Sequence, residues 1–192
     1  MSKKTLWQRI VRVFNPGPKL PSHAQKQAVI RQFAQKYGIQ YLVETGTCHG
    51  DMVAAMQPEF KKIISIELAD KFYHEVCERF KGAANVELIH GDSAKKLPEV
   101  VAKLEGRAIF WLDGHYSGGD TARGEQDTPV NDELRAIFKS GAPDHIVLID
   151  DARCFGTDPS YPSIQYLREL VQTLRPGWNF EVAGDSIRIF PN

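Results

Sequence analysis

Short apolar runs and helical patterns alternate along most of the chain. From residue 41 onward, five apolar runs occur, YLV, IISI, VELI, AIFWL and IVLI, at 41–43, 63–66, 86–89, 108–112 and 146–149. Short apolar runs bounded by turn residues are typical of strands that are buried on both faces of a sheet. The chain closes with the strand-like segments NFEVA and SIRIF, joined by a Gly-Asp pair, and this arrangement predicts a β-hairpin.

The segments between these runs carry apolar residues at helical spacing. Residues 23–37 predict one helix, with an apolar stripe and a terminal glycine at Ile30, Phe33, Ala34, Tyr37 and Gly38. A second helix, after the first apolar run, is expected to have Asp51 as its cap. Two further helices are expected to have Asp70 and Ser93 as their caps, and another to start at Thr128-Pro129. Gly82, Gly106 and Gly141 lie at or beyond the ends of these three helices, and a last helix covers about 163–174.

This alternation of strands and helices predicts an α/β fold. Parallel strands need helical crossovers, so we expect a Rossmann-like, doubly wound seven-stranded sheet that is mostly parallel and ends in an antiparallel C-terminal hairpin. The segment NPGPKLPS at 15–22 holds three prolines and a glycine. It divides the chain into a basic N-terminal segment with a Pro-rich linker, 1–22, and a domain, 23–192.

The composition of the 192 residues is that of a globular protein. Hydrophobic residues make up 42% and charged residues 25% of the chain, and no apolar run approaches the length of a membrane span. No apolar segment is followed by a small-residue cleavage site, so secretion is not indicated. The three cysteines form neither a zinc-ligand spacing nor a disulfide framework. We therefore expect a protein of the reducing cytoplasm.

The formal net charge of zero hides an uneven distribution. Residues 1–40 carry eight Lys or Arg and no Asp or Glu, and subtraction from the totals of 24 and 24 leaves 16 basic and 24 acidic residues in 41–192. Residues 3–14 place Leu6, Ile10 and Val13 on one helical face between basic residues. We expect this face to pack on the domain or in a homodimer. Peripheral contact with an anionic membrane ranks second, and nucleic acid third because aromatic residues are few.

Residues that can carry chemistry follow all five parallel strands. The five segments are ETGTCHG at 44–50, Glu67, GDS at 91–93, LDGHYSGG at 112–119 and IDDA at 149–152. Each alone has an ordinary interpretation as a turn glycine or a helix cap. In open α/β sheets, however, ligands bind outside the carboxyl ends of the strands, so five such segments at consecutive strand ends favour a ligand site.

The first of these segments indicates the charge of the ligand. A dinucleotide site prefers G-x-G-x-x-G, whereas this chain has Glu44-x-Gly46-x-x-x-Gly50. A carboxylate at Glu44 is unfavourable beside a pyrophosphate and suits a ligand that carries positive charge. S-adenosylmethionine (SAM) has a sulfonium, an ammonium and a ribose but no phosphate, so it fits this pattern better. Glu67, 21 residues after Gly46, is placed to accept hydrogen bonds from ribose hydroxyls.

On these motifs, residues 41–192 resemble a class I SAM-dependent methyltransferase. ETGTCHG resembles the first motif of the family, Glu67 its ribose-binding acid, and Asp92 with Ser93 the position that reads the adenine edge. The resemblance implies a cofactor-binding set of Glu44, Thr45, Gly46, Thr47, Gly50, Glu67, Asp92, Ser93 and Asp113. Within the class, Asp113-Gly114-His115 and Asp150-Asp151 are similar to small-molecule O-methyltransferases of the macrocin and catechol types. The chain departs from the family at Asp51, where a Ser or Thr is usual, and in its long loop 114–128.

A hydroxyl acceptor needs a base or a metal ion to lower its pKa. His115, beside Asp113, is of the residue type that titrates near neutrality and is our candidate for the general base; the alternative is a histidine with only local hydrogen bonds. Asp113, Asp150 and Asp151 end neighbouring strands and form an all-oxygen set that suits Mg²⁺. The alternative keeps Asp113 near the cofactor and makes Asp150 or Asp151 a cap or loop anchor.

The sequence therefore leaves three candidate functions open. The first is methylation of a small-molecule or sugar hydroxyl with SAM, with metal assistance left open. The second is a non-catalytic module that holds a cofactor or nucleotide while the basic segment binds an anionic partner; such a module has no need of Asp113, His115, Asp150 and Asp151. The third, an NAD-dependent oxidoreductase, is weakened by the missing G-x-G-x-x-G.

Overall fold

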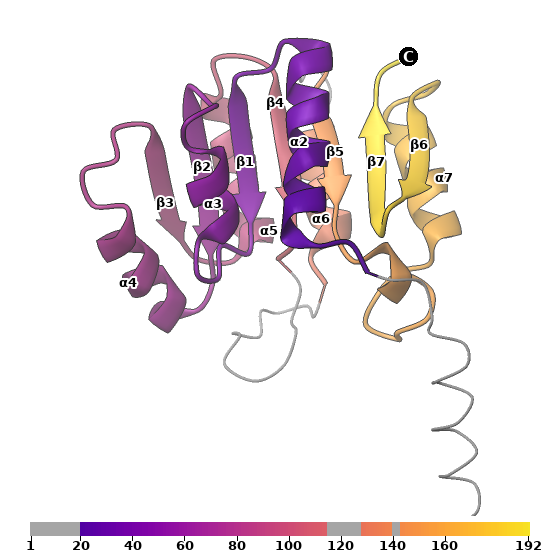
Figure 1. The fold of residues 1–192 in the computed structure, drawn as a ribbon. Helices are drawn as coiled ribbons and strands as arrows, with labels where there is room; N and C mark the ends of the chain where they lie inside the picture. Colours follow the sequence, from indigo (N-terminus) through magenta and orange to yellow (C-terminus); the bar gives the residue numbers. More distant parts are fainter. Residues whose placement is uncertain (1–19, 115–127, 140–142) are drawn as a thin grey trace, which may run out of the picture.

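A single seven-stranded sheet forms the centre of the protein (Figure 1). The computed structural model describes residues 20–114, 128–139 and 143–192. The strands are β1 (Tyr41–Thr45), β2 (Lys62–Glu67), β3 (Val86–His90), β4 (Ala108–Leu112), β5 (Ile146–Ile149), β6 (Asn179–Ala183) and β7 (Ser186–Phe190). Their order is β3-β2-β1-β4-β5-β7-β6, with β7 antiparallel to both β5 and β6. This confirms the predicted fold class and the terminal hairpin.

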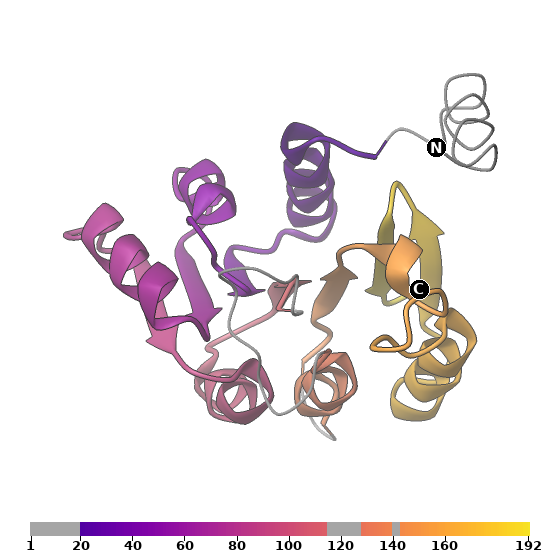
Figure 2. The ribbon, with the colours of Figure 1, turned by 90° about the horizontal axis from the view of Figure 1, so that it is seen from below.

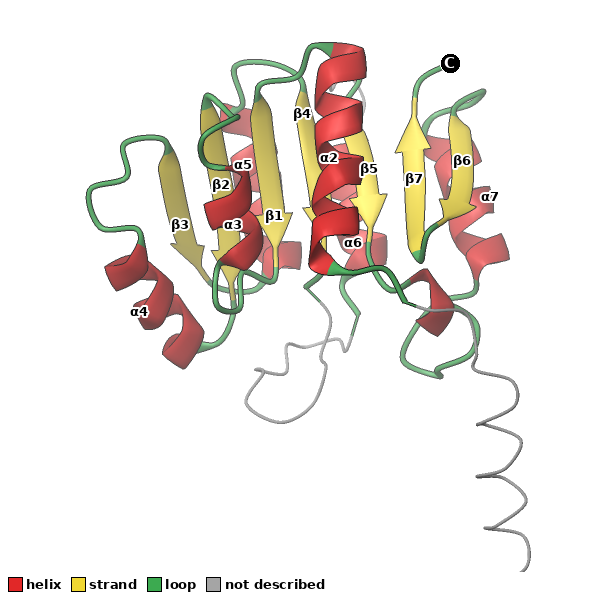
Figure 3. Ribbon diagram, viewed as in Figure 1, coloured by secondary structure: helices red, strands yellow, loops and turns green. Residues whose placement is uncertain are grey.

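Helices cover both faces of the sheet (Figures 2 and 3). One face carries α2 (His23–Tyr37) and α3 (Asp51–Met56), and the other carries α5 (Ser93–Lys103), α6 (Val130–Ile137) and α7 (Ile164–Leu174). The helix α4 (Asp70–Arg79) packs beside β2 and β3, and a short 3₁₀ turn, η1 (Ala152–Cys154), follows β5. The sheet is thus doubly wound, as the alternating pattern predicts.

Each parallel strand contributes to two separate hydrophobic cores. In β1, Leu42 packs into the core that contains Ile30 of α2, whereas the next residue, Val43, packs into the core that contains Leu97 of α5 and Leu134 of α6. Successive side chains of a strand point to opposite faces, so a strand covered on both sides must be apolar throughout. This is why β1, β2, β4 and β5 were recognisable as apolar runs, whereas the edge strand β3 is only partly buried and carries the exposed Glu87.

Several helix starts differ from the prediction by one residue. The cap of α5 is Asp92, whose Oδ1 accepts a hydrogen bond from the backbone N–H of Ala94 at 3.0 Å, and Ser93 is the first helical residue. Asp51 and Asp70 likewise begin their helices instead of capping them. A carboxylate in the first turn still interacts favourably with the helix dipole, so the residue types marked the helix starts while the positions shifted.

The strand order reverses between β1 and β4. From β1 the chain winds outward through β2 to β3, then returns to place β4 on the other side of β1. Thr45 consequently pairs with Ile66 on one side and with Leu112 on the other. The carboxyl ends of β1, β2 and β4 therefore lie together at the point where ligands bind in sheets of this kind.

Two groups of predictions concern residues outside the described ranges. They are the basic face at 3–14 with its expected packing, homodimer or membrane contact, and the base candidate His115 in the loop after Gly114. These stay predictions. In the ranges that the structure describes, no helix combines the length and the hydropathy needed to cross a membrane.

Candidate functional site

The turn after β1 lies directly against the end of β4. Gly46 has a φ of +83°, and a Cβ added there would lie 2.4 Å from the carbonyl oxygen of Asp113. The N–H of Asp113 in turn donates to the carbonyl of Thr45 at 3.0 Å. At Gly50, with a φ of +77°, an added Cβ would lie 2.6 Å from the Phe80 ring. The atoms that approach these two glycines are therefore protein atoms, and contact with a ligand stays a prediction.

Glu44, on β1, is a buried carboxylate at this junction. Its side chain is 3% exposed, and Oε2 accepts a hydrogen bond from the hydroxyl of Ser65 at 2.5 Å. That hydroxyl also lies 2.6 Å from Oγ1 of Thr47. Burial, with a smaller contribution from the charges of Asp113 and Glu67, raises the pKa of Glu44 to about 8. The site thus holds a carboxyl group that is largely protonated near neutral pH and that a nearby cation would ionise.

Glu67, at the end of β2, links β2 to the glycine turn that follows β1 through hydrogen bonds. Its Oε2 accepts the backbone N–H of Cys48 at 2.8 Å, and its Oε1 accepts that of Ala69 at 2.8 Å. The residue is 7% exposed. A carboxylate oxygen has more than one acceptor position, so each oxygen can accept a further hydrogen bond. The orientation of Glu67 is therefore set by backbone donors before any ligand binds.

Thr45 and Ser93 meet at Gly114, just beyond β4. A Cβ added to Gly114 would lie 3.0 Å from Oγ1 of Thr45 and 3.5 Å from Oγ of Ser93. Both residues are buried, and Oγ1 of Thr45 has no hydrogen-bond partner among the described residues. Asp92, one residue earlier, is engaged as the cap of α5. The predicted first-motif, adenine-edge and fourth-strand residues thus do lie around one junction.

A lysine lies among the three carboxylates that were expected to bind a metal. Nζ of Lys26, from α2, forms an ion pair with Oδ2 of Asp150 and lies 3.8 Å from Oδ1 of Asp151. Burial acts to lower the pKa of Lys26, but the hydrogen bond and charge of Asp150, with the charges of Asp113 and Asp151, outweigh it and raise that pKa. The ammonium is therefore held in its charged form.

Asp150 itself is the most deeply buried member of this group. Its side chain is 2% exposed, and Oδ1 has no hydrogen-bond partner in the described part of the chain. Burial raises the pKa of Asp150 against the opposing attraction of Lys26. The charge on Asp150 therefore depends on the neighbouring ammonium.

Asp151 is fixed from the other side by an arginine. Nη1 of Arg153 contacts Oδ1 of Asp151 at 2.6 Å and also pairs with Oδ2 of Asp185, in the hairpin turn. Asp151 has a φ of +54° and precedes η1 as its N-cap residue, without a side-chain capping bond. Within 20–114, 128–139 and 143–192, no group of three or more His, Cys, Asp or Glu is arranged to hold a metal ion. The Mg²⁺ prediction for Asp113, Asp150 and Asp151 is therefore not supported.

A small hollow lies beyond the ends of β4 and β5. It is lined mainly by apolar side chains and by both residues that flank the undescribed part of the loop: Leu112, Gly114, Thr128, Val130, Ile149 and Tyr161. Burial raises the pKa of the Tyr161 hydroxyl, so this group stays neutral. With a volume of about 10 Å³, the hollow has room for no more than a single water molecule, so it does not accommodate an acceptor.

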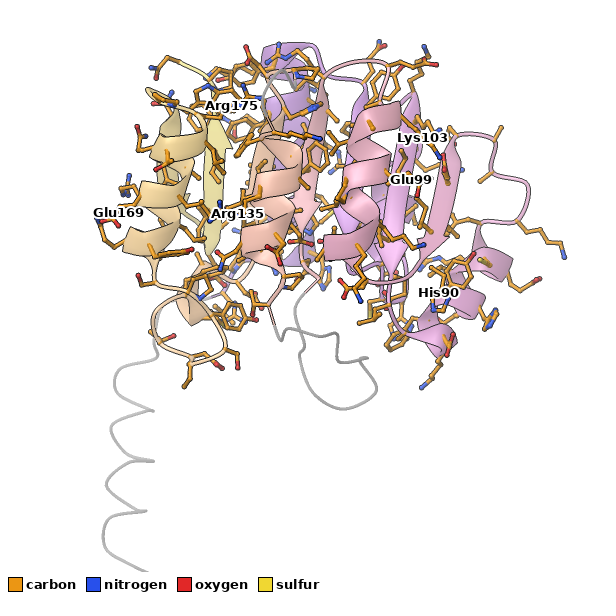
Figure 4. All side chains as sticks on the ribbon, turned by 180° about the vertical axis from the view of Figure 1, so that it is seen from behind. His90, Glu99, Lys103, Arg135, Glu169 and Arg175 are labelled. Atoms are coloured by element: carbon orange, nitrogen blue, oxygen red, sulfur yellow. The ribbon has the colours of Figure 1, made fainter. Side chains whose placement is uncertain are left out.

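A larger cavity of about 530 Å³ lies elsewhere, between α5 and the strands β2 and β3. Its lining includes Tyr41 at the amino end of β1, and Glu99 and Lys103 of α5, which pair at 2.7 Å (Figure 4). None of the predicted site residues lines it. The carboxylates and the glycine turn lie away from this cavity, at the opposite, carboxyl edge of the sheet.

Sequence reasoning missed two residues of the site, Lys26 and Ser65. Lys26 lies four residues before Ile30 and seven before Phe33, so it falls on the apolar face of its helix, an unusual position for a lysine. Ser65 is the one hydroxyl in the buried run IISI. A charged or hydroxyl side chain at an apolar position was the available signal in both cases.

Solved structures with a similar fold include several methyltransferases. No protein-family model and no curated protein sequence matches the chain. The O-methyltransferase TomG from Streptomyces achromogenes, solved in complex with SAM, is 17% identical, with a TM-score of 0.61, over 94% of this chain and 86% of its own. The O-methyltransferase from Bacillus cereus, in complex with S-adenosylhomocysteine (SAH), is 13% identical, with a TM-score of 0.62, over 99% and 92%.

The N-methyltransferase NodS from Bradyrhizobium japonicum is also similar, at 13% identity and a TM-score of 0.58, over 88% of this chain and 96% of its own. The chain thus has the fold of class I SAM-dependent methyltransferases, as its motifs implied. The fold is common to enzymes that methylate oxygen and nitrogen, so it does not identify the acceptor atom.

Replacing Gly46 should destabilise the protein more than replacing a comparable glycine. In Gly46→Ala the new Cβ meets the backbone of Asp113, whereas Gly82, with nearly the same φ of +84°, has nothing within 4 Å of the added atom. Both variants incur about 1–2 kcal/mol for the left-handed backbone, and only Gly46→Ala adds the steric clash. Urea unfolding measures both; equal losses would contradict the packing role of Gly46.

Glu44 should make the free energy of unfolding fall as pH rises. Between pH 4.5, the ordinary pKa, and about 8, the folded protein holds a proton on Glu44 that the unfolded chain has released. This group therefore lowers stability with a slope of up to about 1.4 kcal/mol per pH unit in that window. Urea unfolding between pH 5 and 8.5 should show a shallower fall for Glu44→Gln. Glu181→Gln, exposed on β6, is the control and should follow the wild type.

Removing the Lys26 ammonium should leave Asp150 with a buried and uncompensated charge. We expect Lys26→Met to lower the free energy of unfolding by about 3 kcal/mol, and the double variant Lys26→Met/Asp150→Asn to recover part of this loss. Lys36→Met, exposed at the other end of α2, is the matched control and should change it by less than about 0.5 kcal/mol. Equal stabilities of Lys26→Met and the control would show that the pair contributes nothing.

Proposed function

We propose that this chain is a SAM-dependent methyltransferase that methylates a hydroxyl group of a small molecule or sugar. The observation that carries the proposal is the cluster of carboxylates around the glycine turn. Glu44, Glu67 and Asp113 come from three adjacent strands, and the charges of Glu67 and Asp113 act on Glu44 at the point where the strand order reverses. Such a cluster is stabilised by a ligand that brings positive charge.

The charge of this edge selects among nucleotide-like ligands. A buried carboxyl with a pKa of about 8 becomes ionised when a cation binds beside it, so the donor set fits the ammonium and sulfonium of SAM. The pyrophosphate of NAD would meet the same carboxylates at short range and be repelled. The acidic edge therefore supports SAM over a dinucleotide, which agrees with the absence of G-x-G-x-x-G from the sequence.

Individual residues receive roles from their position. Glu67, oriented by the N–H groups of Cys48 and Ala69, is our proposal for the group that binds the ribose hydroxyls. Glu44, Thr45, Gly46, Thr47 and Gly50 form the turn proposed to hold the methionine portion, and Asp92 with Ser93 lies where the adenine would be read. Asp113 borders both the cofactor turn and Lys26.

In the proposed reaction, the cofactor supplies the methyl group, and the protein aligns the acceptor and removes its proton. When bound, SAM would supply an electrophilic methyl group on its sulfonium, with the cofactor held by the residues of the glycine turn and by Glu67. The protein must align the acceptor and remove the hydroxyl proton. His115 stays our proposal for the proton acceptor, and it lies outside the described residues.

Isothermal titration with SAM, SAH and NAD tests this proposal. The wild type should bind SAM and SAH and should give no heat with NAD. In Glu67→Gln the loss of a charged acceptor for ribose should weaken SAH binding by about 1.5–3 kcal/mol, roughly 10- to 100-fold. Glu87→Gln, half-exposed on β3 and paired with Lys62, is the control.

Circular dichroism and thermal melting establish that each variant is folded. A wild type that binds neither SAM nor SAH would refute the methyltransferase proposal. Unchanged SAH affinity in a folded Glu67→Gln would leave the cofactor in place and remove Glu67 from the ribose.

A further inference from the structure

A cation from outside the sheet lies against two carboxylates at the carboxyl edge, and the charge of a third acts on it. Asp113, Asp150 and Asp151 follow β4 and β5, the neighbouring strands at the centre of the sheet. The first turns of α2 reach this same carboxyl edge (Figure 1), and they bring Nζ of Lys26 into contact with Asp150 and to 3.8 Å from Asp151. The chain thus supplies its own positive charge to a position that the sequence pattern assigned to a metal ion.

We propose that the Lys26 ammonium permanently takes the place of a divalent metal ion at this edge, so that the site needs no metal. The inference rests on the proposed function in one respect: if the chain is a methyltransferase, it states that methyl transfer proceeds without a metal ion. The geometry of the lysine and the three carboxylates stands without that function.

Lys26 and a divalent ion exclude each other by charge and by shared ligands. Mg²⁺ requires oxygen ligands at about 2.0–2.1 Å in octahedral geometry. Oδ2 of Asp150 is already bonded to the ammonium, and Oδ1 of Asp151 is bonded to Arg153 at 2.6 Å. A metal ion bound to these oxygens would lie within a few ångströms of two fixed cations. Binding would therefore require Lys26 to leave the partly buried pair that it forms with Asp150.

The position of Lys26 in its helix makes this arrangement durable. The side chain is 19% exposed, and Ile30, one turn further along the same face, is fully buried in the core under α2. The helix also begins with a capping box, in which Ser22 and Gln25 bond each other's backbone N–H. Lys26 therefore projects from a well-anchored first turn, and its charge is positioned by the helix.

Binding of Mn²⁺, followed by electron paramagnetic resonance, tests the inference directly. Mn²⁺ accepts the same oxygen ligands as Mg²⁺ and its free and bound forms are distinguishable. The wild type should leave added Mn²⁺ free at submillimolar concentrations. Lys26→Met removes the ammonium while keeping all three carboxylates, so it should gain Mn²⁺ binding. Lys26→Met/Asp150→Asn should lose that gain, and Lys36→Met should behave as the wild type.

Each outcome decides the question. Mn²⁺ binding by the wild type that is lost in Asp150→Asn would overturn the inference, as would a folded Lys26→Met that gains no binding. Where Lys26→Met does not fold, the wild-type titration alone decides. SAH titration of the same samples keeps the two proposals separate: a wild type that binds neither SAH nor Mn²⁺ refutes the methyltransferase but not the role of Lys26.

Discussion

The contact between the turn after β1 and the end of β4 is the constraint on which the site depends. Gly46 has no side chain, so the carbonyl of Asp113 can lie where a Cβ would otherwise be. This close approach draws together the carboxyl ends of β1, β2 and β4 at the reversal of strand order. Glu44, Glu67 and Asp113 are neighbours because the strands that carry them are neighbours, and not because they are close in the sequence.

Bringing carboxylates together in a partly dry place has an energetic cost, and the protein offsets it in three different ways. Glu44 is held by the Ser65 hydroxyl and has a raised pKa. Glu67 is stabilised by two backbone N–H groups. Asp150 is neutralised by Lys26. Only Asp150 is paired with a full opposite charge. The edge therefore stays acidic around Glu44 and Glu67, where a cationic ligand is proposed to bind, whereas Lys26 neutralises it at the end of β5.

This difference separates two carboxylate groups that look alike in the sequence. Asp113, Asp150 and Asp151 were grouped as metal ligands because they follow neighbouring strands. In the structure Asp150 and Asp151 are engaged by Lys26 and Arg153, residues from α2 and from η1. The interpretation of Asp151 as a loop anchor, which was kept open from the sequence, agrees better with its contact to Arg153 and its place before η1.

The sequence by itself determined the fold and predicted the edge of the sheet at which the site lies. Strands buried on both faces are largely apolar, so β1, β2, β4 and β5 could be recognised in the sequence, whereas the edge strand β3 is only partly buried. The terminal hairpin followed from its Gly-Asp turn. The rule that ligands bind at the carboxyl ends then pointed to the edge of the sheet where Glu44, Glu67 and Asp113 come together. Only the tertiary structure showed which side chains form ion pairs, such as Lys26 with Asp150. Lys26 lies 124 residues from Asp150, and no local pattern relates them. Helix caps and strand runs arise from neighbours in the chain, whereas ion pairs arise from neighbours in space, and these form only when the helix packs on the sheet.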